Sequence, residues 1–293
     1  MYRVPAARSV PEMSSPEFDA DAFHTFEAAG WEKHADGYHR FFAPITTRVT
    51  DQLLDACQIH RGSRVLDVAT GPGYVAAACA ERGASVTGVD IASEMVKLAR
   101  QLHSEINFRQ SDAERLPFTD NSFDAVTGNF AILHVGRPER AATEFSRVLA
   151  PGGAVALSTW DSPDRCRLAG VFADAVSEVA APPPAEIPPG PPFFRFASDS
   201  EFTNLLAGAG FADIRVRAVS FTHLVPSADA LWDGLLGGTV RTRASILGQP
   251  PETQRHIRAA FDQLVAEYHG EGGLHMPVSV KVASARKPGH PGG

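Results

Sequence analysis

The sequence lacks three features that would each point to a particular class of protein. No apolar run approaches the ~20 residues of a membrane-spanning helix, and residues 1–16 contain no apolar stretch typical of a signal peptide. Positive charge is not in excess, because 27 Lys and Arg face 34 Asp and Glu and give a formal net charge of -7. Only three cysteines occur, too scattered for a disulfide framework or a zinc site: Cys57, Cys79 and Cys166.

These absences narrow the function. A net negative chain is not expected to bind nucleic acid or anionic membranes without specificity. We therefore expect a cytoplasmic protein with reduced core cysteines, no membrane span, no metal site and no nucleic-acid partner, and a homodimer is compatible with the sequence. With 293 residues, 44% of them hydrophobic, the chain is long enough to bury a sizeable core.

Short apolar segments alternate with helical ones between residues 63 and 160. This alternation is typical of βαβ units, which build a parallel sheet whose strand carboxyl ends share one ligand-binding edge. The pattern predicts strands at 65–69, 85–90, 106–110, 123–129 and 154–160 and helices at 74–81, 93–101 and 139–149. Outside this region it predicts helices at 19–30, 45–57, 163–181, 198–209, 228–236 and 251–269 and strands at 214–225 and 278–285.

Acidic residues stand at the ends of the first three predicted strands: Asp67, Asp90 and Asp112. Carboxylates accept hydrogen bonds from ammonium and hydroxyl groups but repel phosphate. Gly71 and Gly73, in the turn after the first strand, let the backbone approach a ligand closely. We assign the ammonium group to Asp67, ribose hydroxyls to Asp90, and adenine to Asp112 with the amide of Ala113. S-adenosylmethionine is a ligand of this kind.

Five ordered segments resemble the successive motifs of the class I S-adenosylmethionine-dependent methyltransferases, most of all the ubiquinone/menaquinone-biosynthesis type that acts on small molecules. These segments are 65–73, 88–95, 111–118, 123–126 and 144–153. The resemblance implies an α/β fold with a Rossmann-like, mostly parallel seven-stranded sheet, helices on both faces, and antiparallel strands six and seven. It implies these roles: Ala69, Gly71 and Gly73 along the methionine part, Asp90 at the ribose, Ile91 and Met95 beside adenine, Asp112 and Ala113 at its edge, and Asn129 near the methionine amino group.

The expected organisation follows from this resemblance and from composition. Seven of the 22 prolines fall in 182–192, outside the motif region. We expect a disordered tail (1–17), N-terminal cap helices (18–44), an S-adenosylmethionine-binding core (45–160), a variable segment with strand six (161–225), a helical insertion over the substrate (226–272), strand seven (273–286) and a tail (287–293). The aromatic residues near 193–196, the N-terminal helices and the insertion are expected to shape the substrate pocket.

Methyl transfer needs a general base only if the acceptor arrives protonated. His134 is a candidate base because it follows the fourth strand at the ligand-binding edge. Tyr38 and His39 are further candidates because their aromatic segment could lie over the cofactor. The expected reaction is methyl transfer to an oxygen, nitrogen or carbon of a small, apolar or aromatic molecule. We also expect Asp90 to be an exposed carboxylate that adds little to stability.

Two alternatives stay open at this point. One is a methyltransferase-fold protein with another S-adenosylmethionine-linked or non-catalytic role. The other is a NAD-type oxidoreductase with a similar glycine-rich turn. Asp67 before the glycines and Ala76 in place of a third glycine disfavour that reading.

Overall fold

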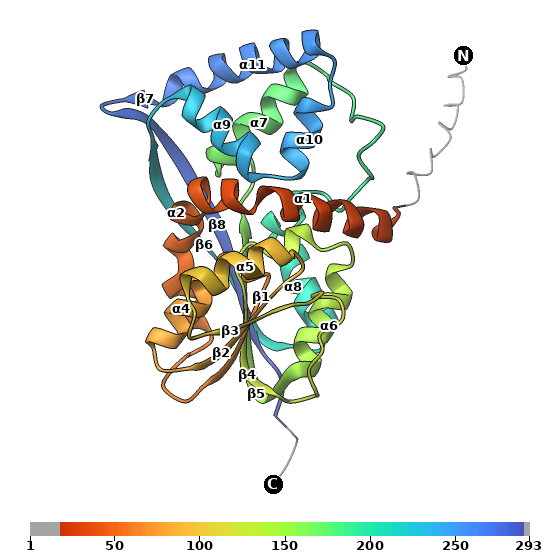
Figure 1. Cartoon of the computed structure of the whole chain (residues 1–293), viewed down its shortest axis with the longest axis vertical. Helices are drawn as coiled ribbons and strands as arrows, with labels where there is room; N and C mark the ends of the chain where they lie inside the picture. The colour runs from red at the N-terminus through yellow and green to blue at the C-terminus, as the bar shows by residue number, and fades with distance from the viewer. Residues whose placement is uncertain (1–17, 290–293) are drawn as a thin grey trace, which may run out of the picture.

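A twisted, mostly parallel sheet forms the centre of the computed structural model, which describes residues 18–289 (Figure 1). The strands follow the order β3-β2-β1-β4-β5-β8-β6, and β7 adds a short pair to β8. Their bounds are β1 (Arg64–Val68), β2 (Ser85–Asp90), β3 (Asn107–Gln110), β4 (Phe123–Gly128), β5 (Leu149–Trp160), β6 (Ala212–Val225), β7 (His269–Gly270) and β8 (Gly273–Arg286). Strands β1 to β5 run parallel, and β8 is antiparallel to both β5 and β6. The predicted α/β class is confirmed.

Helices cover both faces of this sheet. Successive strand residues point to opposite faces, so Val65 joins the hydrophobic cluster on one side and Leu66 the cluster on the other. Helices α3 (Thr50–Ala56), α4 (Tyr74–Glu81) and α5 (Ser93–Leu102) contact strands β5, β2 and β3, respectively. Helices α6 (Pro138–Val148) and α8 (Asp199–Gly208) contact each other and pack on β5 and β6. The central strands β1, β4, β5 and β8 are thereby buried between two apolar layers, whereas the edge strands β3 and β6 are more exposed.

Four further helices form a cap beyond one end of the sheet (Figure 1). We call these four the cap helices, and the name does not include the N-terminal helices at 18–44. They are α7 (Arg167–Glu178), α9 (Ala228–Gly238), α10 (Arg241–Leu247) and α11 (Pro251–Val265). The long helix α1 (Ala20–Phe41) runs between the cap helices and the sheet region. Short helices complete the described chain: α2 (Ala43–Thr46), η1 (Thr47–Val49), η2 (Ile132–His134), η3 (Arg195–Ala197) and η4 (Ala266–Tyr268). Within residues 18–289, a membrane-spanning helix is not found.

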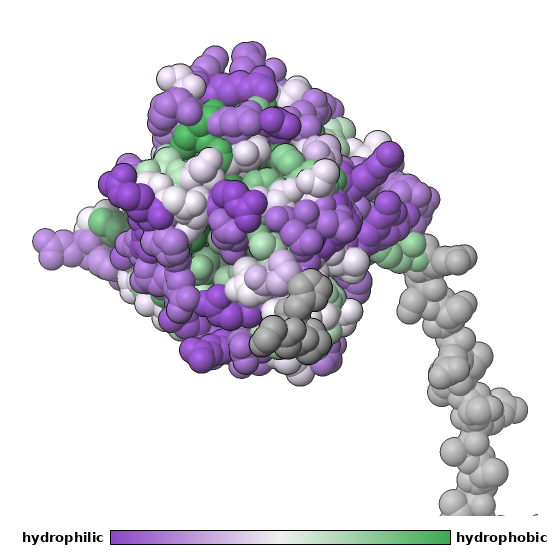
Figure 2. All heavy atoms as spheres, turned by 90° about the horizontal axis from the view of Figure 1, so that it is seen from below, coloured by the Kyte–Doolittle hydropathy of each residue, from purple (hydrophilic) through white to green (hydrophobic). Residues whose placement is uncertain are grey.

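The face farthest from the cap helices is mainly hydrophilic. Figure 2 shows this end, where hydrophobic residues appear only in small separate areas between polar and charged ones. Such a mixed surface is ordinary for the exterior of a folded domain.

Several predicted elements differ from the structure. The helix predicted at 19–30 continues through the aromatic segment as one helix, α1, which begins after Asp19; its carboxylate accepts from the N–H groups of Asp21 and Ala22. Glycine is typical of a helix end, but Gly30 lies inside α1. Its lack of a side chain makes room for Val240, because a Cβ on Gly30 would lie 2.3 Å from Cγ1 of Val240. The helix predicted at 45–57 is divided into α2, η1 and α3, and helix α10 was missed. The last strand begins at 273, where the predicted strand-seven segment begins, rather than at 278. The predicted tail at 1–17 lies outside the described residues.

Helices α1 and α9 approach each other backbone to backbone. A Cβ on Gly37 of α1 would lie 2.1 Å from the carbonyl oxygen of Gly237 in α9. A Cβ on Gly237 itself would meet nothing within 4 Å. The two glycines belong to the same crossing, yet only Gly37 needs its hydrogen for this contact, which holds the cap helices against α1.

We predict that Gly37→Ala lowers the free energy of unfolding by about 1–3 kcal/mol, because the added methyl group meets backbone that cannot rotate away. Gly237→Ala is the matched control and should be neutral or stabilising by up to ~1 kcal/mol, since alanine favours helix. Urea unfolding of both variants measures the difference. Equal free energies of unfolding would contradict the close approach.

Candidate active site

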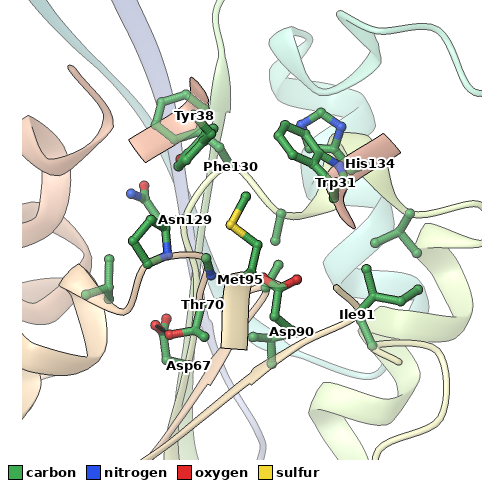
Figure 3. A pocket seen from close by; sticks show the side chains of 18 of the residues that line it. Trp31, Tyr38, Asp67, Thr70, Asp90, Ile91, Met95, Asn129, Phe130 and His134 are labelled. Carbon is green, nitrogen blue, oxygen red and sulfur yellow. Dashed lines mark hydrogen bonds between the residues drawn. The ribbon is translucent and has the colours of Figure 1, made fainter. Parts of the chain in front are cut away.

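A hollow opens at the carboxyl ends of β1, β2 and β4, beneath helix α1. In Figure 3, Asp67 and Asp90 lie beside the strand ends, with Tyr38, Phe130 and Trp31 across the hollow. Most of the predicted site residues line it: Tyr38, Asp67, Ala69, Gly71, Asp90, Ile91, Met95, Asp112, Ala113, Asn129 and His134. We call this space the cofactor hollow. Gly73 and His39 are not among its lining residues.

Asp67 is the last residue but one of β1, and its carboxylate is almost fully buried. One oxygen accepts from the Thr70 hydroxyl at 2.6 Å, and the other accepts from the Thr127 hydroxyl at 2.8 Å. Burial disfavours the charged form and raises the pKa of Asp67 to about 6. The carboxylate therefore fixes the turn after β1 in addition to bordering the hollow.

Asp90 ends β2 and organises the adjoining backbone. Its two oxygens accept from the N–H groups of Gly71, at 2.9 Å, and Ala92, at 3.0 Å. The residue is only 6% exposed, so the expectation of an exposed carboxylate is wrong. Burial raises its pKa to about 6. Because an ionised carboxylate has about four acceptor positions, both oxygens can still accept ribose hydroxyls.

The two glycines of the turn after β1 have different structural roles. Gly71 has φ +52° and faces the hollow, where a Cβ would lie 3.8 Å from Cε1 of Tyr38. Gly73 has φ +85° and immediately precedes α4, and a Cβ there would come within 2.7 Å of the Phe108 ring. Gly71 thus borders the ligand space, whereas Gly73 allows the turn to pack against β3.

Other predicted cofactor contacts surround these carboxylates. Asn129 is held in place because its amide nitrogen donates to the Thr46 carbonyl at 3.1 Å and its oxygen accepts from the Ser158 hydroxyl at 2.6 Å. Asp112 accepts from the N–H of Glu114 at 2.8 Å. The remaining predicted contacts supply an apolar border: Ala69, Ile91, Met95 and Ala113.

The three candidate bases have different surroundings. His134 borders the hollow, and its Nδ1 lies 2.9 Å from a carboxylate oxygen of Glu27. The Tyr38 hydroxyl lies 3.2 Å from that of Thr46, and burial raises the pKa of Tyr38 to about 12, so the phenol stays protonated near neutral pH. His39 lies 3.2 Å from the Tyr74 hydroxyl, beside a separate surface groove.

Several residues of the hollow were missed from the sequence. Those on α1 are His24, Glu27 and Trp31, and they share its inner side with Tyr38. Their spacing is a helical signal, since residues three, four and seven apart lie on one face. A helix that ends at Gly30 separates His24 and Glu27 from Trp31 and Tyr38, so the shared face becomes apparent only in the full length of α1. Thr46 and Phe130 were also missed, and nothing in the local sequence marks them.

The charges around the cofactor hollow have one sign. Its lining includes four carboxylate residues and neither Lys nor Arg. A cation that carries an ammonium group fits such a lining, whereas a pyrophosphate would be repelled. Residues 18–289 contain no group of three or more His, Cys, Asp or Glu side chains that could hold a metal ion. The donor set therefore fits S-adenosylmethionine better than a dinucleotide.

Comparison with known proteins agrees with this chemistry. The model of the methyltransferase domain family matches residues 66–157. The demethylmenaquinone methyltransferase of Renibacterium salmoninarum is 38% identical over 118 residues, 40% of this chain and 50% of that protein. The first curated relatives are thus matched over about half of their length or less.

A longer match reaches the C-terminal half. The ubiquinone/menaquinone biosynthesis C-methyltransferase UbiE of Azotobacter vinelandii is 30% identical over 250 residues, 78% of this chain and 93% of that protein. The crystal structure of YcgJ from Bacillus subtilis superposes with a TM-score of 0.57 at 20% identity, covering 82% of this chain and 98% of the other, and supports the fold.

The fold and the acidic, phosphate-excluding hollow define a class I S-adenosylmethionine-dependent methyltransferase, and the chain belongs to this family. Within the family it is of the ubiquinone/menaquinone type. Its cofactor is S-adenosylmethionine.

We predict that Asp90→Ala weakens S-adenosylmethionine binding about 10- to 100-fold, because hydrogen bonds to a charged group contribute about 1.5–3 kcal/mol. Asp124→Ala is the control, since Asp124 lies near the start of β4 and pairs with Arg64. Calorimetry gives both affinities, and circular dichroism verifies folding. An unchanged affinity in folded Asp90→Ala would remove Asp90 from the site.

The raised pKa values of Asp67 and Asp90 predict a pH-dependent cofactor affinity. The cationic ligand favours the ionised carboxylates, so protons compete with it. Affinity should be retained at a pH above about 7 and should fall below about pH 6, by up to about tenfold per pH unit for each carboxylate. Calorimetry across this range measures the effect, and an affinity independent of pH would contradict it.

Proposed function

We propose that this protein transfers the methyl group of S-adenosylmethionine to an oxygen, nitrogen or carbon atom of a small, largely apolar or aromatic molecule. One observation carries the proposal: a second hollow adjoins the cofactor hollow. Five residues border both spaces: Trp31, Tyr38, Thr46, Phe130 and His134. A reactant in the second hollow would face the cofactor across this shared border, as an in-line displacement requires. We call the second space the acceptor chamber.

The acceptor chamber is rich in aromatic side chains, which make up nine of its twenty border residues. Its aromatic border comprises Trp31, Tyr38, Phe42, Phe130, His134, Trp160, Phe172, Phe193 and Phe194. Its volume is about 290 Å³, close to the lower end of the range for small-molecule sites. Helices α7, α9 and α10 contribute most of the remaining border, and Thr46, Thr239 and Val240 complete it. The N-terminal helices, the aromatic segment near 193–196 and the insertion, which we expect to shape the substrate pocket, all supply residues to it.

A planar ring suits this chamber, because aromatic side chains bind rings in stacked or edge-on arrangements. The names of the relatives point the same way, since they describe methylation of demethylmenaquinone and C-methylation in ubiquinone and menaquinone biosynthesis. We therefore favour a quinone-type ring or a related phenol as the acceptor.

The residues divide the work of the reaction. S-adenosylmethionine, when bound, supplies a methyl group already activated by its positively charged sulfur. Asp67, Asp90 and Asn129 bind and orient that cofactor, while the aromatic border excludes water from the reacting atoms. His134 is the group that takes a proton from the acceptor. Tyr38 remains a protonated phenol and so contributes a polar contact rather than a base.

Incubation with methyl-labelled S-adenosylmethionine tests the proposal. The acceptors are a panel of hydroquinones, phenols and amines, and mass spectrometry detects a product heavier by one methyl group. Binding of the cofactor without transfer to any acceptor would favour a non-catalytic role. Binding of NAD without binding of S-adenosylmethionine would favour the oxidoreductase. A cytoplasmic location, a homodimer and the absence of a nucleic-acid partner stay predictions.

We predict that Ala169→Trp blocks the acceptor chamber, because Ala169 lies on its border and the indole would fill it. The kcat/KM for the acceptor should fall at least about tenfold, whereas S-adenosylmethionine affinity should be unchanged. Ser177→Trp is the control, since it adds the same side chain at an exposed position of α7 outside the border. Equal activity in both variants would place the acceptor elsewhere.

A further inference from the structure

A buried carboxylate lies next to the shared border of the two hollows, on the side of the cofactor hollow. Glu27 projects from α1 and is only 2% exposed. Burial of a charged carboxylate is costly unless it is paired. Glu27 also borders the cofactor hollow, but from α1 rather than from the strand ends where Asp67, Asp90 and Asp112 stand. Its contacts point to another role.

One oxygen of Glu27 has two nitrogen neighbours. Oε2 accepts from the indole N–H of Trp31 at 3.0 Å, and it lies 2.9 Å from Nδ1 of His134. The other oxygen, Oε1, lies 3.4 Å from Nε of Arg241, whose positive charge compensates the carboxylate. The arginine is itself fixed, because it donates to the carbonyls of Leu133 and Pro191, both at 2.7 Å.

This contact decides which nitrogen of His134 carries the hydrogen. An ionised carboxylate can only accept, so Nδ1 must be the donor and Nε2 keeps its lone pair. The imidazole ring also packs edge-on against Trp31, with the ring centroids 4.8 Å apart. Ring orientation and tautomer are thus both fixed, on a residue that borders the cofactor hollow and the acceptor chamber alike.

We infer that Glu27 is a positioning residue that holds His134 as the Nδ1–H tautomer, with Nε2 available to take a proton from the acceptor. The inference rests on the proposed function. It narrows the acceptor to a molecule whose nucleophilic atom arrives protonated, such as a phenol or quinol hydroxyl or an acidic C–H.

The proton balance follows from this arrangement. The acceptor proton passes to Nε2, and the electron pair it leaves behind forms the new bond to the methyl carbon, whose bond to sulfur breaks with its pair left on sulfur. The imidazolium that results is stabilised by Glu27 and later releases its proton to water. Glu27, His134 and Arg241 come from α1, η2 and α10, so the arrangement exists only where helix α1, the sheet region and the cap helices meet.

The tautomer can be observed without any acceptor. We propose nitrogen NMR of the folded protein labelled in its histidine rings, in mildly alkaline buffer, with the His134 signals assigned through His134→Asn. The expected result is a protonated Nδ1 and an unprotonated Nε2. A protonated Nε2 in the wild-type protein would overturn the inference, whatever the protein methylates.

Kinetics then separate positioning from a merely structural role. Glu27→Gln should lower kcat at least about tenfold for a weakly acidic phenol, since general-base catalysis contributes about 10²–10⁴-fold. It should change kcat less than about twofold for a nitrophenol that is already ionised at the assay pH, because no base is then needed. Equal losses for the two acceptors would show that Glu27 acts only on the structure.

Two further variants complete the design. Glu27→Asp keeps an acceptor-only carboxylate and should recover part of the lost kcat. Glu32→Gln is the matched control, because Glu32 also links α1 to the rest of the fold, through Ser93 and Glu94, and makes no contact with His134. It should leave the His134 tautomer and both rates unchanged. A panel that yields no methylated product would instead count against the proposed function, and the NMR result would still decide the tautomer.

Discussion

The burial of Asp90 at the end of β2 is the constraint on which the cofactor hollow depends. Its carboxylate joins the turn after β1, through Gly71, to the start of α5, through Ala92. Removal from water disfavours its charge, as the raised pKa shows, and the same holds for Asp67. Two neighbouring carboxylates whose ionised form is disfavoured by burial give the hollow a strong preference for a cation. A cationic ligand such as S-adenosylmethionine stabilises the ionised carboxylates, so the buried charge that costs stability in the free protein contributes to affinity.

Helix α1 converts that cofactor hollow into a site with two chambers. Its inner side carries Trp31 and Tyr38, which border both spaces. Its small residues Gly30 and Gly37 let the cap helices come close, and a longer side chain at either position would force them away. The acceptor chamber is therefore formed largely by helix packing outside the motif-bearing sheet region, which contributes Phe130, His134 and Trp160 to its border. This separation explains how a shared cofactor site can serve different acceptors.

The sequence was most informative where local pattern and fold agree. Helix α4 and strand β2 have the predicted bounds, and Asp67, Asp90 and Asp112 converge because parallel strands end at one edge. The sequence-based predictions were wrong where contacts between residues distant in the sequence determine the local structure. Gly30 favours a helix end locally, but the packing of Val240 gives it another use. The burial of Asp90 and the pairing of Glu27 with His134 arise only after α1 lies over the sheet edge, which no local pattern encodes.

The signs of the charges also explain why a base would be useful in this fold. An acceptor that reached the shared border as an anion would face Asp67, Asp90 and Asp112 across the cofactor hollow, while Arg241, which borders the acceptor chamber, already faces Glu27. A neutral phenol or quinol meets no such repulsion and is favoured by the aromatic chamber. It needs to become negative only at the moment of transfer, beside a cationic sulfur that stabilises the charge. A histidine held by a buried carboxylate at the shared border provides proton removal at that place, which makes the two-chamber geometry and the Glu27–His134 pair parts of one electrostatic arrangement.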